Sequence, residues 1–587
     1  MHLLTGTLPM REGSHRRNAL TTKKAYRWTV APPPPDGLLT RLSEELTIAP
    51  SLVSVLINRG IDSFERARQY FRPSLDQLHD PFLMDGMHLA VDRLLRARDQ
   101  KEKVLVYGDY DVDGTNGASM LHLFFSEIGC TSAYYIPDRL TEGYGISQTG
   151  VEYAKKEGVT LLVAIDCGIT ALAQVEYARQ LGIDVIICDH HEPAEEIPNA
   201  VAVLDALKPN CRYPFKSLCG TGVGFKFIQA IARTIGQDHL VPKYIDFVAL
   251  ATTADIVPLV DENRVFVRLG LERLNTDTRP GIRALLEGAG LKIGQMTTGQ
   301  VVFALAPRIN AVGRLGDAKR AVELLISTDF ESSVRFARVL EQENLNRRKI
   351  DEGVFEEAKN LVEEYFTKHG DGAIVMHQEQ WHPGVVGIVA SRMVERYYRP
   401  AVMLTTVEGV AKGSARSIAG VNIHQALKTV EDKLLQFGGH KYAAGVSVDL
   451  DRIDEFRDAF NAVIRGMLTE DLLTPEIHID TEIDLSELTP KYLRVLKQFA
   501  PFGPQNMRPT FLAREVSVVG LPRIVGKDHL RFKVKKNGVT FDCIGFGLGS
   551  LLELVKTKQN ALDVVFSIDE SDFMGSAMTQ LKIKDVR

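Results

Sequence analysis

The chain has 587 residues, of which 45% are hydrophobic and 25% charged, the usual balance of a globular protein. That composition excludes a mostly disordered, collagen-like or coiled-coil protein, and the length predicts three or four domains at about 100–200 residues each. Lysine and arginine total 70 against 75 aspartates and glutamates, which gives a net charge of −5. Any basic surface for nucleic acid must therefore be local. No apolar run reaches the roughly 18 residues that span a bilayer, so we expect no membrane segment.

The six cysteines include no CxxC pair, and Cys167 and Cys188 lie inside apolar runs. Small buried thiols are therefore expected rather than metal ligands or disulfides, which fits a reducing, cytoplasmic setting. The first 35 residues carry several basic side chains and end in Pro32–Pro35, without the apolar core of a signal peptide. We expect residues 1–35 to be a disordered or misassigned extension and not an export signal. Residues 36–75 are expected to form a helical segment.

From Lys103 onward, short apolar runs end in acidic or histidine residues. Val104–Tyr107 leads into Gly108–Gly114 (GDYDVDG), Leu161–Ile165 into Asp166-Cys167-Gly168, and Val185–Cys188 into Asp189-His190-His191. Helix-like stretches between them end at Gly129 and Gly182, as helices with C-cap glycines do. Continuous apolar strands alternating with helices predict a mostly parallel sheet covered on both faces. In such sheets, ligands bind beyond the carboxyl ends of the strands.

A fourth polar site follows Phe247–Thr253, which we interpret as a helix ending at the acidic turn of Asp255. A lone aspartate after a strand is usually the N-cap of the next helix. Four such sites on one edge of a sheet, with a double histidine among them, favour a functional cluster instead.

The rest of the chain predicts a connecting helix, a second lobe and a β-domain. Residues 329–369 are strongly charged with apolar residues at helical spacing, which favours one long helix, or two in line, over a coiled coil. A second α/β lobe begins at Gly372 and contains three glycine-marked segments. From about Thr474, short alternating strands predict a small β-barrel or sandwich. In His529–Lys535, a period of two makes one face cationic and the other apolar.

The strand-end residues are oxygen and imidazole donors, which favours a divalent metal site. Several carboxylates placed together repel one another unless a cation compensates them. A mixed carboxylate and imidazole set suits Mn²⁺, or Mg²⁺ if few histidines bind, better than a tetrahedral zinc site. Five or more candidate ligands are too many for one ion and suit two ions that share a bridging carboxylate. The residues alone thus predict metal-dependent phosphoryl hydrolysis without identifying the substrate.

The four strand-end motifs resemble those of the DHH phosphoesterase superfamily. The Gly438-Gly439-His440 turn, with the segments around His382 and Arg416, is similar to the DHHA1 domain that follows in that superfamily. The order of lobe, connecting helix, second lobe and β-domain resembles the RecJ family of single-strand-specific 5′→3′ DNA exonucleases, as does the turn Pro501–Asn506 (PFGPQN). The resemblance covers about 76–587. It implies two α/β lobes (DHH and DHHA1) joined by a long helix, plus a C-terminal OB-fold barrel.

The resemblance also implies a separate role for each of the motif residues. Two Mn²⁺ or Mg²⁺ ions would be held by Asp111, Asp113, Asp166, His190 and Asp255, with Asp166 as the bridge. Related two-metal enzymes have a histidine at the position of Tyr107, so Asp109 is expected to supply the replacement contact. His191 would face the scissile phosphate, stabilising its charge or protonating the departing oxygen, while Asp189 orients a neighbouring histidine.

Substrate contacts follow from the same resemblance. Arg314, Ser414 and Arg416 match positions that hold a 5′ phosphate, which a guanidinium grips with two hydrogen bonds. Arg139 is a candidate strand contact, with a surface ion pair as an equally good interpretation. His440 is expected in the wall of a DNA channel. Four cations of the β-domain are candidates for backbone contact, as an alternative to a solvated strand face: Lys527, Arg531, Lys533 and Lys535.

The sequence therefore predicts a two-metal exonuclease that degrades single-stranded DNA from its 5′ end in recombination and repair. Two enzyme alternatives remain: a DHH phosphodiesterase of short oligonucleotides or cyclic dinucleotides, and, less well supported, a family II pyrophosphatase. A non-catalytic DNA-binding scaffold is the alternative of another class. A single-strand-binding protein and a helicase are the partners that the resemblance implies, and a monomer is expected. The predicted divisions are 1–35, 36–75, a DHH domain at 76–315, a connecting helix at 316–369, DHHA1 at 370–470 and the OB-fold at 471–587.

Overall fold

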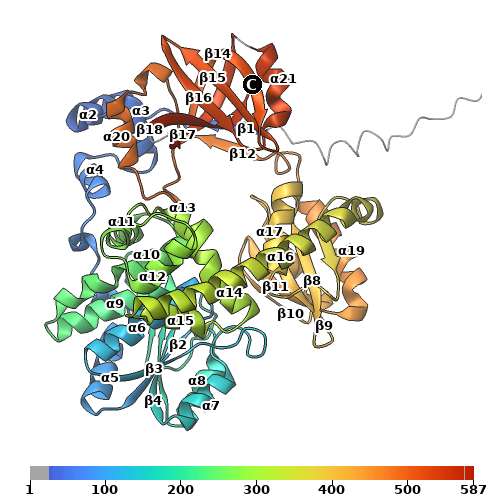
Figure 1. Cartoon of the computed structure of the whole chain (residues 1–587). Helices are drawn as coiled ribbons and strands as arrows, with labels where there is room; N and C mark the ends of the chain where they lie inside the picture. The colour runs from blue at the N-terminus through green and yellow to red at the C-terminus, as the bar shows by residue number, and fades with distance from the viewer. Residues whose placement is uncertain (1–25, 559, 574–575) are drawn as a thin grey trace, which may run out of the picture. The chain divides into compact units, whose positions relative to one another are not determined.

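A five-stranded parallel sheet, in the order β3-β2-β4-β5-β6, forms the centre of the first lobe (Figure 1). The computed structural model describes residues 26–558, 560–573 and 576–587. The strands are β2 (Lys103–Gly108), β3 (Thr131–Tyr135), β4 (Val159–Ile165), β5 (Asp184–Cys188) and β6 (Ala202–Leu204). β2 comes first in the chain yet lies between β3 and β4, so the chain changes direction across the sheet beside it. This switch point opens a crevice at the carboxyl edge, where ligands bind in open α/β sheets.

Helices cover both faces of this sheet, as the continuous apolar strands predicted. Alternate residues of β2 and β4 face opposite cores: Val104 and Val106 pack under one layer, Leu105 and Tyr107 under the other. The first layer contains α5 (Met87–Asp99), α6 (Val112–Glu127) and α9 (Gly220–Thr234). The second contains α7 (Gln148–Lys156) and α8 (Leu172–Gln180). Both faces are therefore buried, and only the strand ends present polar groups.

A further helical layer extends the first core. Its members are α10 (Ile245–Ala254), α11 (Asp261–Thr276), α12 (Pro280–Gly288), α13 (Thr298–Gln300), α14 (Ala306–Leu315) and α15 (Lys319–Ile326). A π-helical turn, Val301–Leu305, separates α13 from α14. α10 ends at Asp255, which confirms the predicted helix with an acidic turn. α16 (Phe330–His369) is a single 40-residue helix, as its charge and spacing predicted.

The second lobe is built on a mixed five-stranded sheet in the order β10-β11-β9-β8-β7. Its strands are β7 (Ile374–His377), β8 (Ala401–Val407), β9 (Val410–Arg416), β10 (Gln436–Gly439) and β11 (Ala443–Asp449). α17 (Val386–Tyr397), α18 (Ile423–Thr429) and α19 (Ile453–Met467) pack on it through two apolar clusters. Residues 346–478, with 26–29, form one compact unit, and residues 30–345 with 479–587 form the other.

The C-terminal domain is a β-barrel that closes because β14 pairs with both β15 and β17. Its strands are β13 (Thr481–Glu482), β14 (Phe511–Val525), β15 (His529–Lys536), β16 (Val539–Gly545), β17 (Leu562–Phe573) and β18 (Ser576–Val586). α20 (Pro490–Lys497) and α21 (Leu552–Thr557) belong to the same domain. Leu530, Phe532 and Val534 are buried in the barrel while the residues between them face outward, which confirms the predicted alternation.

Helices from the other end of the sequence complete the barrel core. α2 (Asp36–Leu46), α3 (Pro50–Asn58) and α4 (Phe64–Phe71) confirm a helical segment, and Leu52, Val55 and Tyr70 pack in the same cluster as the barrel strands. Within the predicted extension, β1 (Arg27–Val30) pairs with β12 (Glu476–Ile479), while residues 1–25 lie outside the described residues. The barrel domain is thus assembled from two distant parts of the chain.

Buried Arg264 joins the first lobe to the barrel domain. From α11 its guanidinium donates hydrogen bonds to the carbonyls of Tyr70, Phe499, Gln498 and Ala500, and it lies 3.6 Å from the centre of the Tyr70 ring. Asn506 accepts a hydrogen bond from the Tyr70 hydroxyl and donates to the carbonyls of Phe499 and Pro501. The PFGPQN turn is therefore held by Arg264 of the first lobe, which bonds to the residues before it, and by Tyr70 of α4, which bonds to its last residue, Asn506.

Two predictions from composition can be compared with the structure. All six cysteines are free and buried, as expected for small thiols in apolar surroundings. Among the described residues, no helix is both long and apolar enough to cross a membrane.

Candidate metal centre

The predicted acidic and histidine residues meet at the carboxyl edge of the first sheet. Asp109 and Asp111 follow β2, Asp166 follows β4, and His190 follows β5, while Asp255 arrives from the end of α10. Three groups of these side chains have donor atoms within 4.8 Å of one another: Asp166 with His190 and His191; Asp113 with His190 and Asp255; and Asp109 with Asp111 and Asp166. The groups share Asp166 and His190, so they form one continuous cluster.

Two helix N-termini hold the first motif. Asp111 is the N-cap of α6, and its Oδ1 accepts hydrogen bonds from the amides of Asp113 and Gly114. Asp113 lies inside that helix, where its two carboxylate oxygens accept from the amides of Gly220 and Thr221 at the start of α9. Asp111 and Asp113 therefore lie at the N-cap and within the first turn of one helix, and not on an extended segment. The partial positive charges of the helix ends stabilise both carboxylates.

Close backbone approach explains the glycines among the motifs. A Cβ at Gly114 would lie 2.4 Å from the Asp109 carbonyl oxygen, and one at Gly220 would lie 2.7 Å from the Asp166 Cβ. Asp166 itself has a left-handed backbone, with φ of +61°. Such a conformation is unfavourable for a non-glycine residue and occurs preferentially at functional sites. The two glycines therefore allow the first motif to fold tightly on Asp109 and the start of α9 to approach Asp166.

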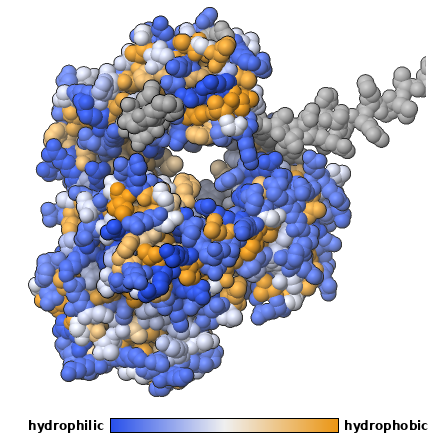
Figure 2. All heavy atoms as spheres, in the orientation of Figure 1, coloured by the Kyte–Doolittle hydropathy of each residue, from blue (hydrophilic) through white to orange (hydrophobic). Residues whose placement is uncertain are grey.

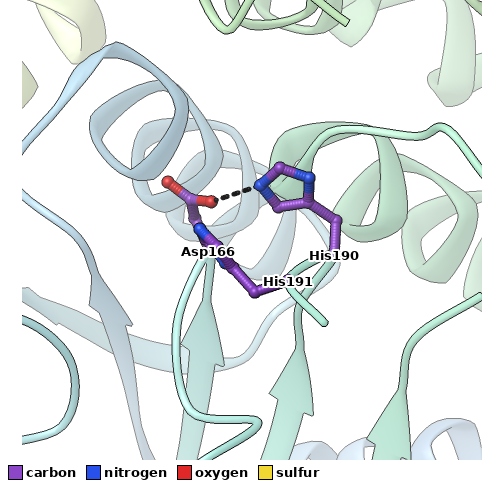
Figure 3. Close-up of side chains that lie close together, drawn as sticks. All are labelled: Asp166, His190 and His191. Carbon is purple, nitrogen blue, oxygen red and sulfur yellow. Dashed lines mark ion pairs between the residues drawn. The ribbon is translucent and has the colours of Figure 1, made fainter. Parts of the chain in front are cut away.

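The atoms that face one another across the cluster fit a metal site. His190 Nε2 lies 3.1 Å from Asp166 Oδ1 (Figure 3) and 3.8 Å from a carboxylate oxygen of both Asp113 and Asp255. Asp109 Oδ1, Asp166 Oδ1 and His190 Nε2 are buried without a hydrogen bond within the described part of the chain. Leaving buried polar atoms unsatisfied is costly, and divalent cations provide the missing interaction. Oxygen donors with an imidazole suit Mn²⁺ and Mg²⁺.

The electrostatics of the cluster lead to the same interpretation. Burial, followed by repulsion from neighbouring carboxylates, raises the pKa of Asp109, Asp166 and Asp255 well above the usual range. Burial also lowers the pKa of His190, which favours the neutral imidazole that ligates metals. The protein alone therefore disfavours the charged state of its own carboxylates, and cations would reverse that preference.

His191 is oriented by Asp189 on one side and Tyr144 on the other. Its Nδ1 lies 2.7 Å from Asp189 Oδ1, and Asp189 is fixed in turn by the backbone amides of Ile169 and His190. The Tyr144 hydroxyl lies 3.2 Å from the His191 ring nitrogens and donates to the Asp166 carbonyl. Although burial opposes it, the bond to Asp189 raises the pKa of His191 to about 9. Asp189 therefore orients the His191 ring and favours its protonated form beside the cluster.

Tyr107 takes no part in this centre. Its side chain packs in the second core, where its hydroxyl donates to the Gly145 carbonyl and accepts from the Ser147 amide. Asp109, two residues later, is buried and grouped with Asp111 and Asp166. The acid beyond the strand, and not the aromatic residue within it, faces the candidate ligands.

Two of the predicted arginines approach the first motif. The Arg139 guanidinium lies 5.0 Å from the centre of the Tyr110 ring. Arg314 lies in the last turn of α14, and the preceding Gly313 packs so closely that a Cβ there would lie 2.3 Å from the Tyr110 carbonyl oxygen. Both cations are close enough to counteract the burial that raises the pKa of Tyr110.

Ser414 and Arg416 share one face of β9 in the second lobe. Arg416 donates hydrogen bonds to the Ser414 hydroxyl and to the Ala415 carbonyl. A Cβ at Gly387, in the first turn of α17, would lie 3.2 Å from both side chains. A guanidinium, a hydroxyl and a helix N-terminus that lacks a side chain are therefore adjacent. His440 is exposed in the turn between β10 and β11.

The predicted cations of the barrel face outward, although some are paired. Asp542 lies 3.7 Å from Arg531 and 3.8 Å from Lys533. Lys527 and Lys535 are exposed. The strand register places Arg523, Arg531 and Lys582 in one row across β14, β15 and β18, with the buried Ile544 of β16 between Arg531 and Lys582. The side chains of this row that reach the surface are therefore cationic.

Three residues of the site were missed from the sequence. Tyr144 contacts His191 from the loop after β3, where an aromatic residue between two glycines was the available signal. Asp205 follows β6, is fully buried, and has a pKa that burial raises to about 7. It obeys the same strand-end pattern, but its strand has only three residues. Lys582 joins the cationic row of the barrel only through the pairing of β16 with β18.

Comparison with known proteins identifies all three domains. The chain matches the sequence models of the DHH family, N-terminal domain, over residues 103–252, of the DHHA1 domain over 370–466, and of the RecJ OB domain over 479–585. These matches, together with the sheets and barrel described above, confirm the predicted fold class and the family resemblance.

Curated and solved relatives extend over most of the chain. It is 37% identical over 562 residues to the single-stranded-DNA-specific exonuclease RecJ of Bacillus subtilis, covering 95% of this chain and 70% of that protein. The Escherichia coli protein of the same name is 32% identical over 561 residues, covering 92% and 96%. The crystal structure of Thermus thermophilus RecJ in complex with Mn²⁺ superposes with a TM-score of 0.82 at 28% identity, covering 96% of this chain and 79% of that one.

Proposed function

Because the chain belongs to the RecJ family of single-stranded-DNA-specific exonucleases, we propose that it hydrolyses single-stranded DNA from the 5′ end to mononucleotides, in recombination and repair. The observation that carries the proposal is the cluster around Asp166 and His190, in which Asp109 Oδ1, Asp166 Oδ1 and His190 Nε2 are buried without a hydrogen bond within the described residues. A non-catalytic DNA-binding scaffold would have no need for buried acidic and histidine side chains, which are costly to hold together without a cation.

Two Mn²⁺ or Mg²⁺ ions are the proposed cofactors, in line with the Mn²⁺ and Mg²⁺ complexes of Thermus thermophilus RecJ. The proposed ligands are Asp109, Asp111, Asp113, Asp166, His190 and Asp255, with Asp166 as the bridge because it is the carboxylate that belongs to two of the three donor groups. When bound, the ions supply Lewis-acid activation of water and neutralise charge on the phosphate.

His191 is the proposed donor to the scissile phosphate. Its Nδ1 is engaged by Asp189, so a proton on Nε2 is available to the departing 3′ oxygen or to a non-bridging oxygen. Asp189 acts through His191 by holding its orientation and favouring its charged form. Backbone amides fix the carboxylates of Asp111 and Asp113, which positions the proposed centre against the sheet edge.

Ser414 and Arg416 are proposed to hold the 5′ phosphate of the substrate, and Arg314 is given the same proposed role from the family resemblance. A phosphate suits the second-lobe group because backbone amides at the start of α17 and the guanidinium can both donate to it. Arg139 and His440 are proposed strand contacts. Lys527, Arg531, Lys533 and Lys535 are proposed to contact the backbone on the barrel, an OB-fold suited to unpaired strands.

Further proposals concern the domain boundaries, the cellular location, the oligomeric state and the partners. We keep the domain divisions given above, with a DHH domain at 76–315, a DHHA1 domain at 370–470 and an OB-fold at 471–587. The free, buried cysteines support a reducing, cytoplasmic location. A monomer is proposed, as are a single-strand-binding protein that presents the strand and a helicase that unwinds duplex.

The decisive test uses one single-stranded oligonucleotide labelled at either end, with Mn²⁺, Mg²⁺ or EDTA. The 5′ label should leave at once as mononucleotide while the 3′-labelled strand shortens progressively, and EDTA or Asp166→Ala should abolish both. Cleavage limited to two- to five-residue oligonucleotides would replace the proposal with the short-oligonucleotide phosphodiesterase. Binding without cleavage under any metal would leave the scaffold.

A further inference from the structure

Two buried tyrosines attach the loop after β3, residues 138–147, to the edge of the first sheet. Tyr107 of β2 and Tyr135 of β3 are partners in the strand register, and their rings stack with centres 5.3 Å apart. The Tyr107 hydroxyl donates to the Gly145 carbonyl and accepts from the Ser147 amide, each at 3.1 Å. Neighbouring strands therefore present two hydroxyls side by side to one loop.

Glu142 is the second point of attachment. Its carboxylate accepts hydrogen bonds from the Asp138 amide and the Ser147 hydroxyl, at the two ends of the loop. The Tyr135 hydroxyl lies 3.0 Å from both of its oxygens. One carboxylate thus closes the loop on itself and ties it to β3. Three side chains, which we call the loop anchor, hold the loop in this way: Tyr107, Glu142 and Ser147.

The backbone around Tyr144 needs such support. The residues on either side of it, Gly143 and Gly145, have φ of +83° and +88°. A Cβ at either glycine would meet no atom of the described residues within 4 Å, so the left-handed backbone, and not crowding, is what requires glycine. Glycines lose more conformational freedom on ordering than other residues, and bonds at Gly145 and Ser147 offset that cost directly beside Tyr144.

Tyr144 extends from this loop to the residues of the proposed reaction. Its hydroxyl donates to the Asp166 carbonyl and lies 3.2 Å from both ring nitrogens of His191, and the two rings meet edge to face. The side chain is 53% exposed, but apolar residues are exposed in patches over the barrel and the first lobe (Figure 2), so exposure does not distinguish it. The bonds of its hydroxyl to the centre do.

We propose that the loop anchor positions Tyr144 so that its hydroxyl holds the His191 ring toward the scissile phosphate. The inference rests on the proposed nuclease function and adds to it three positioning residues that contact neither the substrate nor the ions. They act on the reaction only through the loop, which carries their effect to the metal centre.

His191 needs contacts on more than one side to be fixed. The bond from Asp189 to Nδ1 holds one atom of the ring and leaves the ring able to tilt about that atom. The Tyr144 hydroxyl contacts the ring at a second place, so the two contacts together set the direction of Nε2. A proton donor must lie within hydrogen-bond reach of the oxygen that it protonates. Displacement of the ring should therefore slow the chemical step and leave the affinity for DNA unchanged.

The test uses Tyr107→Phe, which keeps the stacked ring and removes only the hydroxyl. On a 5′-phosphorylated single-stranded 12-mer with Mn²⁺, we expect kcat to fall about 10- to 100-fold, a part of the contribution of general acid catalysis. KM and the Mn²⁺ affinity measured by calorimetry should stay at the wild-type values. Tyr144→Phe should lower kcat in the same way, and the double variant should be no slower than the slower single variant.

Limited digestion with trypsin reports on the loop without DNA or metal. Tyr107→Phe should speed cleavage after Arg139, which lies in the loop, and Glu142→Ala should do the same from the other attachment. Fragments ending at Arg139 are identified by mass spectrometry, and melting temperatures show that the variants remain folded. Tyr177→Phe is the matched control, because it removes a hydroxyl that bonds to Glu152 between α8 and α7 in the same helical layer. It should change neither kcat nor the rate of digestion.

Three results would overturn the inference: an unchanged kcat in Tyr107→Phe, losses that multiply with those of Tyr144→Phe, or equal digestion after Arg139 in wild type and Tyr107→Phe. A rise in KM at constant kcat would also overturn it, because the loop would then contact the substrate instead of positioning His191. If wild type cleaves no DNA with any metal, the nuclease proposal fails separately. Faster digestion of Tyr107→Phe would in that case still support the loop anchor.

Discussion

Replacing Arg264 by methionine should weaken the junction between the first lobe and the barrel domain. The side chain is 5% exposed and donates to four backbone carbonyls at 3.0–3.3 Å. Loss of four such bonds, at about 1–1.5 kcal/mol each, would destabilise the fold by about 4–6 kcal/mol, and stacking on Tyr70 adds about 1 kcal/mol. Burial of the cation opposes this: it lowers the pKa of Arg264 to about 10, equivalent to roughly 3 kcal/mol. The net expectation is about 2–4 kcal/mol.

The appropriate assay is chemical unfolding monitored with one spectroscopic probe in the barrel domain and another in the first lobe, because a protein of several domains need not unfold in one step. Arg264→Met should lower the midpoint of the barrel transition and expose the PFGPQN turn to limited proteolysis. Arg264→Lys should be nearly as damaging, since an ammonium cannot reproduce the planar fork. Arg68→Met, which removes an exposed arginine paired with Glu65 on the same helix, is the matched control and should leave the midpoint nearly unchanged. An Arg264→Met midpoint equal to that of the control would refute the reasoning.

Three further predictions concern the site. Saturating Mn²⁺ should raise the melting temperature, because each ion bound at 100 times its Kd adds about 2.7 kcal/mol to the free energy of unfolding. Asp166→Asn should abolish most of this rise. An equal rise in wild type and variant would argue against a bridging role for Asp166. Asp189→Asn should lower kcat about 10²- to 10⁴-fold with little change in Mn²⁺ affinity measured by calorimetry, whereas a collapse of metal affinity would make Asp189 a ligand. Arg416→Ala and removal of the substrate 5′ phosphate should each lower kcat/KM about 10- to 100-fold, and the two changes together should cost no more than either alone. Lys412→Ala, on the same strand, is the control and should leave kcat/KM unchanged. If the two losses multiply, Arg416 does not contact the 5′ phosphate.

The arrangement of the metal centre was largely predictable because strand ends follow from local patterns. Apolar runs that stop at Asp109, Asp166 and Asp189 predicted both the parallel sheet and the edge where their side chains would meet. Period-two alternation from His529 to Lys535 likewise predicted which residues enter the barrel core. Local hydrophobic periodicity is encoded in consecutive residues, so it can be detected without knowing the fold.

Local patterns were not sufficient where a distant element determines the geometry. The Asp113 carboxylate is held by the amides at the start of α9, more than a hundred residues later in the chain. Tyr144 reaches His191 only because the loop after β3 passes over the ends of β4 and β5. The flanking residues do not reveal the partner in either contact.

The sequence by itself determined that two α/β lobes and a barrel follow one another, and which strand-end residues could form a two-metal centre. Only the tertiary structure decided that α3 and α4, near the beginning of the chain, pack in the core of the C-terminal barrel. It also decided that the PFGPQN turn bonds to the segment after Asp255 and closes a cavity beside it. The physical reason is that periodicity shows which face of an element is apolar, whereas its partner is chosen by shape and burial over the whole chain.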